Sequence, residues 1–126
     1  MKKLGIKDGV RLTVLNAPQG YASWMKGLPA DAQIVSTMRR PASAVHLFAT
    51  KRRELEQSLP RLRTALAPAG FLWVSWPKKS SGVATDVTED TIREIALPLG
   101  FVDVKVCAVT DTWSGLKLVI RKSERA

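Results

Sequence analysis

The chain has 126 residues, 45% of them apolar and 25% charged, and this balance is typical of a globular domain rather than a disordered segment. No apolar run approaches the roughly 18 residues that a membrane-spanning helix needs, and Lys7, Asp8 and Arg11 interrupt the place where a signal peptide has its apolar core. We therefore expect a single domain over residues 1–126 that is cytoplasmic and has no membrane partner.

The formal net charge of +9 is the most unusual bulk property of the chain. Such a charge attracts an anionic small molecule, an acidic partner or nucleic acid, but it can also simply keep a soluble domain monodisperse. With one cysteine, Cys107, no internal disulfide can form. Because there is only one histidine, His46, a Ser-His-Asp device and most zinc sites would have to use it, and we expect no metal site.

The first half of the chain alternates strand-like runs with turn formers. Residues 10–15 (VRLTVL) predict a strand, and residues 20–28 have the apolar spacing of a short helix. Residues 33–38 predict a weaker strand. Residues 43–49 (SAVHLFA) are apolar apart from His46, which is typical of a strand buried on both faces in the middle of a parallel sheet.

Residues 51–66 predict the longest helix, because four leucines recur on one face at helical spacing. Thr50 is the expected N-terminal cap. Pro60 removes a backbone donor and is expected to kink or split the helix. The turn formers at residues 68–70 are expected to end it.

Residues 70–76 (GFLWVSW) predict another buried strand, and residues 88–99 predict a helix that ends at Gly100. Residues 101–109 alternate as a strand does, and a turn connects them to a last strand at residues 116–121. This order predicts a three-layer α/β fold: a mostly parallel, Rossmann-like sheet with a C-terminal antiparallel hairpin.

The same order resembles a shortened class I S-adenosylmethionine-dependent methyltransferase fold. The hairpin GFVDVKVCAVTDTWSGLKLVIRK lies where that fold has its last two strands, and APAGFLWVSWPK resembles its helix-to-strand passage. Three segments (LGIKDGVRLTVLNAP, LPRLRTALAPAGFLWVSWPK and KVCAVTDTWSGLKLVIRK) also resemble DUF3052, a small bacterial family of unknown function. The resemblance implies a truncated methyltransferase-like fold and does not fix an activity.

Two departures from that fold's pattern concern the cofactor. The resemblance implies an acidic, glycine-rich turn after the first strand, but this chain has LNAPQG, with only Gly20 kept and with Pro18, which lacks an N–H. It also implies an acidic residue at the end of the second strand, where this chain has Arg39 and Arg40. We therefore expect weak or absent binding of S-adenosylmethionine and no cofactor.

Ligands of open α/β sheets bind beyond the carboxyl ends of the strands, where the strand order reverses. By the methyltransferase-like order, that point lies between the strands at residues 10–15 and 43–49. Loops at this edge carry the candidate ligand-binding residues, which are Asn16, Gly20, Tyr21, Lys51, Lys78, Lys79, Ser80, Ser81 and Trp113.

Several of the residues near this edge have an alternative structural role. Residues 78–82 (KKSSG) lack P-loop spacing and either hold a phosphate or form a solvated turn. The cations at residues 51–53 either make an anion site at a helix start or extend into water. Asp86 and Glu89 match a capping pattern for the next helix. Trp113 packs the hairpin or stacks on a flat ligand. His46 is expected to be a core histidine.

These observations predict a domain without catalytic residues that binds an anionic ligand or partner at the carboxyl edge of the sheet. One alternative is an atypical S-adenosylmethionine-dependent methyltransferase or a nucleotide-using transferase. Another is a nucleic-acid binder that contacts the phosphate backbone. A homodimer that pairs through the edge strand of the hairpin also stays open.

Overall fold

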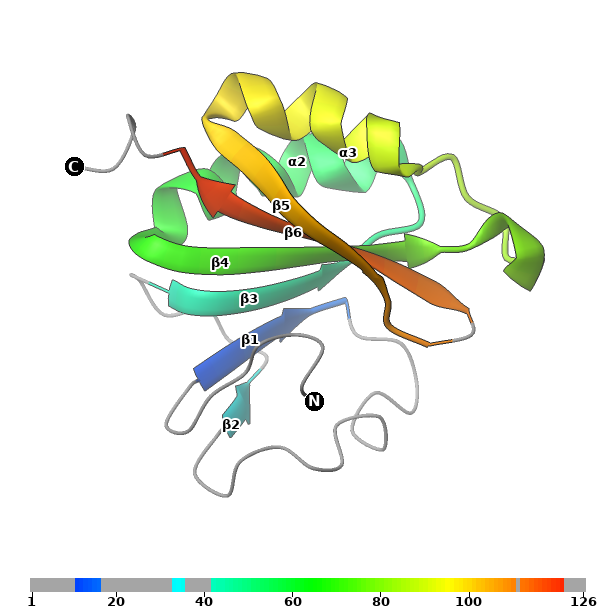
Figure 1. Cartoon of the computed structure of the whole chain (residues 1–126), viewed down its shortest axis with the longest axis horizontal. Coiled ribbons are helices and arrows are strands. Elements are labelled where there is room, and N and C mark those ends of the chain that lie inside the picture. The colour runs from blue at the N-terminus through cyan, green and yellow to red at the C-terminus, as the bar shows by residue number, and fades with distance from the viewer. Residues whose placement is uncertain (1–10, 17–32, 36–41, 111, 122–126) are drawn as a thin grey trace.

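The computed structural model describes residues 11–16, 33–35, 42–110 and 112–121, which form one six-stranded sheet with the order β2-β1-β3-β4-β6-β5 (Figure 1). The first four strands are parallel, and β6 runs antiparallel to both of its neighbours. The order reverses between β1 and β3, as predicted. The bounds are β1 (Arg11–Leu15), β2 (Gln33–Val35), β3 (Ala42–Phe48), β4 (Leu66–Pro77), β5 (Phe101–Ala108) and β6 (Trp113–Ile120).

Helices α2 (Arg52–Ala65) and α3 (Glu89–Ala96) lie on the same face of the sheet (Figure 1). Short 3₁₀ turns, η1 (Lys79–Ser81) and η2 (Leu97–Leu99), follow β4 and α3. The helix predicted at residues 20–28 lies outside the described residues, so the described layers are the sheet and one helical layer. None of the described helices combines the length and apolar character needed to cross a membrane.

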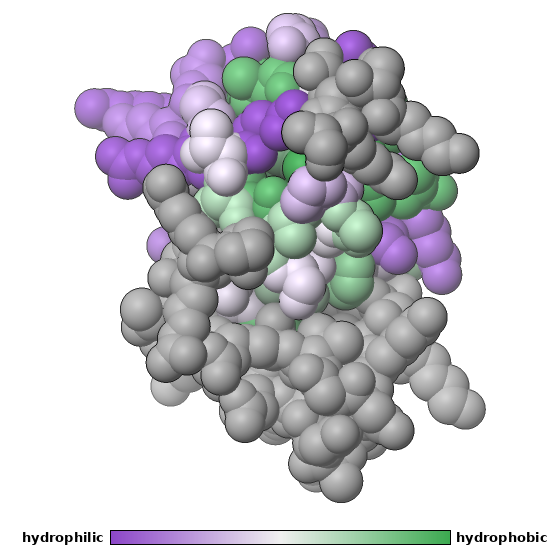
Figure 2. All heavy atoms as spheres, turned by 90° about the vertical axis from the view of Figure 1, so that its left-hand side faces the viewer, coloured by the Kyte–Doolittle hydropathy of each residue, from purple (hydrophilic) through white to green (hydrophobic). Residues whose placement is uncertain are grey.

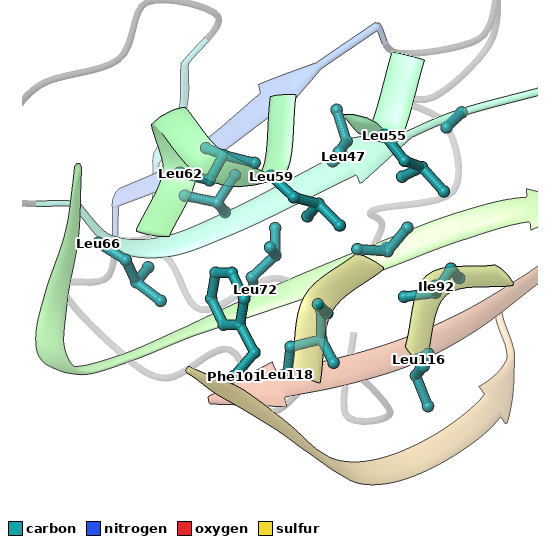
Figure 3. Close-up of a cluster of buried hydrophobic side chains, with 14 of the residues drawn as sticks. Leu47, Leu55, Leu59, Leu62, Leu66, Leu72, Ile92, Phe101, Leu116 and Leu118 are labelled. Atoms are coloured by element: carbon teal, nitrogen blue, oxygen red, sulfur yellow. The ribbon is translucent and has the colours of Figure 1, made fainter. Parts of the chain in front are cut away.

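The main core lies between the sheet and the two helices. The leucines of α2 and Ile92 of α3 point toward apolar side chains of β3, β4, β5 and β6 (Figure 3). The largest fully buried side chains at this contact are Leu47, Leu55, Leu59, Leu72, Ile92, Phe101, Leu116 and Leu118. Because truncating such a residue to alanine typically costs about 2–5 kcal/mol, this contact fixes the helices relative to the carboxyl ends of the strands.

A second apolar cluster lies on the opposite face of the sheet and is made of Leu12, Val14, Ala44, Phe48, Trp73 and Val109. Gly115 of β6 makes room for the indole of Trp73. A Cβ on Gly115 would lie 3.1 Å from Trp73 Cε3 and 2.9 Å from Val109 Cγ2. Strand β6 of the hairpin can therefore pack closely against β4 toward the carboxyl end of β4.

Helix α2 is not split at Pro60, contrary to the prediction, and runs over 14 residues. Pro60 and Glu56, whose carbonyl loses its helical donor, are both exposed, so water can satisfy that carbonyl. The cap also differs from the prediction, because Lys51 is the N-cap. Thr50 instead donates its N–H and its hydroxyl to Glu54 Oε1, at 2.9 and 3.2 Å.

Strand β4 begins at Leu66, so the predicted turn before residue 70 is part of the strand. Ala42 of β3 pairs with Leu66 whereas Ala44 pairs with Phe71, and a bulge in β4 takes up the additional residues. A Cβ on Gly70 would lie 3.0 Å from the carbonyl oxygen of Ala42. Glycine is needed here for close approach of two backbones, which local sequence does not reveal.

Strand β5 has the predicted extent but not one continuous alternation. Asp103 pairs with Leu118 and Lys105 pairs with Lys117, which leaves Val104 as an extra residue. Val104 is 54% exposed. A bulge in an edge strand reverses the face of the sheet from which the following side chains extend. It also discourages pairing with another sheet.

The outer surface of the helical layer is polar and internally paired. Figure 2 faces the side where the parallel strands begin, and hydrophilic side chains gather in its upper part, toward the helices. Arg52 bonds Glu94 at 2.7 Å and Glu56 at 3.4 Å, which links α2 to α3. Arg93 bonds Asp103 at 3.1 Å, which links α3 to β5. Ion pairs raise the pKa of both arginines.

Candidate functional site

The switch point of the sheet is bridged by a side chain. Asn16 directly follows β1 and has a φ of 57°, a left-handed conformation that asparagine tolerates better than most residues. Its Nδ2 donates to the carbonyl oxygen of Phe48 at the end of β3, at 3.4 Å. Asn16 therefore joins the two strand ends between which the order reverses, as expected for a residue at the ligand edge.

The same edge has a short row of aromatic rings. Phe48 is buried, with the His46 ring stacked on it at a centroid distance of 4.2 Å. Trp113, at the start of β6, meets Phe48 edge-on at 5.0 Å and is half-buried. Trp113 thus packs the hairpin against β3, and its stacking on a ligand stays a prediction.

His46 is a core histidine, as predicted. Its side chain is completely buried, and Nε2 lies 2.7 Å from Ser75 Oγ. Burial lowers the pKa of His46 to about 3, so the ring is neutral at pH 7. Behind Phe48 and without solvent access, it cannot serve as a base toward a ligand at the edge.

The loop after β4 is joined to the start of α2. Asp86 Oδ1 accepts the N–H of Arg52 at 2.6 Å, and Thr85 Oγ1 donates to the carbonyl of Thr50 at 2.6 Å. Asp86 therefore caps α2 and not the following helix, contrary to the prediction. The cap of α3 is Thr88, whose hydroxyl accepts the N–H of Thr91 at 3.2 Å.

Two carboxylates therefore already accept backbone N–H groups at the start of α2. Besides Asp86, Glu54 accepts the N–H of Lys51 at 3.0 Å. A helix N-terminus that already holds carboxylates has less to offer a bound anion. The Lys51 side chain is exposed and has no ion pair with any residue that the structure describes.

Residues 78–82 form a turn that satisfies its own hydrogen bonds. Ser81 Oγ donates to the carbonyl of Lys78 at 2.6 Å and accepts the N–H of Val83 at 3.2 Å. Lys79 and Ser80 are exposed. Lys78 N donates to the carbonyl of Thr112 at 2.8 Å, which ties this turn to the hairpin tip.

The structure thus brings Asn16, Lys78 and Trp113 to one edge, through Phe48 and the hairpin tip. Lys51 lies at the α2 start, joined to the same edge by the Asp86 loop. Gly20 and Tyr21 lie outside the described residues. Sequence reasoning missed Phe48, although its place at the end of the strand beside the switch point could have indicated it.

A shallow hollow of about 470 Å³ lies elsewhere, on the outer side of α3, and is lined by Asp90, Arg93, Glu94, Leu97 and Pro98. It shares no residue with the carboxyl edge. Within the described ranges, no group of three His, Cys, Asp or Glu side chains could hold a metal ion.

Several solved structures with a similar architecture are named as methyltransferases. A SAM-dependent methyltransferase from Aquifex aeolicus is 14% identical to this chain, with a TM-score of 0.67. The match covers 94% of this chain and 86% of the Aquifex aeolicus protein. The ribosomal protein L11 methylase from Lactobacillus delbrueckii subsp. bulgaricus is 10% identical with a TM-score of 0.62, over 95% of this chain and 74% of that one. The DhpI-SAH complex is 13% identical with a TM-score of 0.57, over 89% and 77%.

The fold is methyltransferase-like. At these identities the likeness concerns the fold alone. No protein-family model matches the chain and no curated protein matches its sequence, so the resemblance to DUF3052 is not supported. The methyltransferase-like order explains why the switch point falls between β1 and β3.

Proposed function

We propose that this chain binds S-adenosylmethionine at the switch point between β1 and β3 and acts as an atypical methyltransferase. One observation carries the proposal: Asn16 leaves β1 in a left-handed conformation and bonds the end of β3, at the place where open α/β sheets bind their ligands. The solved structures of similar fold, one of them a complex with SAH, favour this function over a domain without a cofactor.

The described residues suit an adenosyl ligand. Asn16 adopts a left-handed conformation without being a glycine, and its amide is a hydrogen-bonding group at the ligand edge. Half-buried Trp113 offers a flat apolar surface for a base. Asn16 and Trp113 would hold the cofactor, which supplies an electrophilic methyl group when bound.

The residues of this edge position ligands rather than remove protons. His46 is neutral and buried, and the Asp86 carboxylate is held by the backbone of α2. The nearby Lys78 and Lys79 would supply ammonium groups to an anionic part of a cofactor or acceptor. We therefore propose a methyl acceptor that needs no general base from the described residues.

Calorimetry with S-adenosylmethionine and S-adenosylhomocysteine tests this proposal. We expect dissociation constants in the range of about 1 μM to 1 mM, typical of enzyme substrates. Asn16→Gly keeps the left-handed turn and removes the amide, so affinity should fall about tenfold, as for the loss of a hydrogen bond of about 1.4 kcal/mol. Gln57→Ala, which removes an exposed amide from α2, should change nothing. If neither compound binds the wild-type chain, the proposal is wrong.

A second function, binding of an anionic ligand without catalysis, is favoured by the exposed lysines of the turn after β4. Lys79 is exposed, and neither it nor Lys78 has an ion pair among the described residues. Phosphate-ligand binding should then be lost in Lys78→Glu/Lys79→Glu, while S-adenosylmethionine gives no heat in the wild type. Unchanged phosphate binding in that variant would exclude this function.

A further inference from the structure

Charges are divided unequally between the helices with their caps and the rest of the described structure. The helical group has six cations (Lys51, Arg52, Arg53, Arg61, Arg63 and Arg93) and seven carboxylates (Glu54, Glu56, Asp86, Glu89, Asp90, Glu94 and Asp103). The other cations with described side chains are Lys78, Lys79, Lys105, Lys117 and Arg121. No described carboxylate remains for this second group, because the seven above belong to the helices, their caps and Arg93.

Two of these lysines stand directly opposite each other. Lys105 of β5 and Lys117 of β6 are partners in the antiparallel ladder, so their side chains extend from the same face. Lys117 Nζ lies 4.8 Å from the centre of the Phe71 ring, which draws it over β4, and Lys105 is exposed. Like charges in this position disfavour folding, whereas two adjacent ammonium groups favour a bound phosphate.

Another lysine, Lys78, lies at the tip of the β5–β6 hairpin. Lys78 is held there by its hydrogen bond to Thr112, one residue before Trp113. From Lys117 to Trp113 the strand advances four residues, which is about 13 Å at about 3.3 Å per residue. A chain of phosphates spans this separation and a single small anion does not. Trp113 lies between Lys117 and Lys78 and is half-buried. Its ring adds an aromatic surface on which a base can stack.

We propose that the hairpin strip, defined as Lys78, Lys105, Trp113 and Lys117, binds the phosphate backbone of a single-stranded nucleic acid. Lysines contact phosphates as point charges without fixed bidentate geometry, so the strip recognises backbone rather than sequence. The net charge of +9 brings such a strand to the protein. Trp113 and Lys78 also belong to the proposed cofactor site, whereas Lys105 and Lys117 do not, so the two hairpin lysines test strand binding independently of the cofactor. The view that the strand is the methyl acceptor rests on the proposed function.

Fluorescence anisotropy with labelled single strands of RNA and DNA, about 16 nucleotides long, tests the strip. The variant Lys105→Thr/Lys117→Thr should lose about tenfold in affinity near 100 mM salt. Its slope of log affinity against log salt should be less steep by about 1.4, since each phosphate contact contributes about 0.7 in single strands. The control Arg53→Ala/Arg61→Ala removes the same charge from exposed positions of α2 and should stay within about twofold of wild type.

Three results would overturn the inference. The first is an equal loss of affinity in the control variant, and the second is no binding of either strand by the wild type. The third is a Lys105→Thr/Lys117→Thr variant that loses binding to a polyglutamate peptide but keeps its binding to nucleic acid. Circular dichroism must show that each variant is folded. Calorimetry with S-adenosylmethionine on the same proteins keeps the two proposals separate. Cofactor binding without strand binding defeats the strip alone, and strand binding without cofactor binding supports the strip and defeats the proposed methyltransferase.

Discussion

His46 lies in the middle strand of the parallel part of the sheet, in register with Val14 on one side and Trp73 on the other. Its Nε2 lies within hydrogen-bonding distance of Ser75 Oγ, on the same face. Sliding β3 by one residue against β4 would place the ring and the hydroxyl on opposite faces and break this buried hydrogen bond. This pair therefore favours the native register of the strands that form the switch point.

The burial of His46 predicts a loss of stability in acid. Its pKa is about 3 in the folded chain and about 6.5 in the unfolded chain, so between these values the unfolded state binds the additional proton. The free energy of unfolding should therefore fall as the pH drops below about 6, with a slope from this group approaching about 1.4 kcal/mol per pH unit until about pH 3. Above that window His46 contributes no pH dependence.

Urea unfolding of wild type and His46→Gln at several pH values measures this slope. Glutamine keeps a hydrogen-bonding group near Ser75 and does not titrate, so the difference between the two proteins isolates the histidine. Even if His46→Gln is less stable at pH 7, the gap should narrow as the pH falls. Parallel curves for the two proteins would show that His46 is not buried in its neutral form.

At the scale of elements, β3 and β5 were predicted to within one residue at each end, because their apolar runs and flanking turn formers are local signals. The early start of β4 was not, since the bulge around Gly70 depends on two carbonyls of β3. Asp86 was assigned to the wrong helix. Its spacing to Glu89 matches a local capping pattern, yet the N–H that it accepts belongs to Arg52, 34 residues away. Contacts through space decide such cases.

Replacement of Asp86 with alanine should destabilise the chain by about 1 kcal/mol, the usual effect of losing an N-terminal cap. The carboxylate joins the loop after β4 to the start of α2, so both elements should loosen, and hydrogen exchange at Arg52 should become faster. Asp90→Ala is a suitable control, because the Asp90 side chain is 88% exposed and, among the described residues, contacts only Arg93, at 3.4 Å. An equal change in the two variants in urea unfolding would contradict the capping role.

For the molecule as a whole, the alternation of strands and helices was enough to predict a mostly parallel sheet, and the resemblance to the methyltransferase-like order predicted the place where the strand order reverses. The chemistry of the site was less accessible. Asn16 was a candidate because it follows β1, but its bond to Phe48 joins residues 32 positions apart. The predicted site residues Gly20 and Tyr21 lie outside the described residues. The division of charge also becomes visible only in three dimensions, because Asp103 turns to Arg93 while Lys105, two residues on, faces Lys117.

If the hairpin lysines are present for binding, removing them should not cost stability. In Lys105→Thr/Lys117→Thr the loss of the contact between Lys117 and Phe71, worth about 0.5–1 kcal/mol at an exposed site, is offset by relief of the opposed like charges, worth about 0.2–1 kcal/mol. The wild type should gain stability as salt screens this repulsion and the net charge of +9, and the variant should gain less. Urea midpoints at low and moderate salt give both quantities. A variant that is less stable than wild type by more than about 1 kcal/mol in low salt would assign the lysines a structural role.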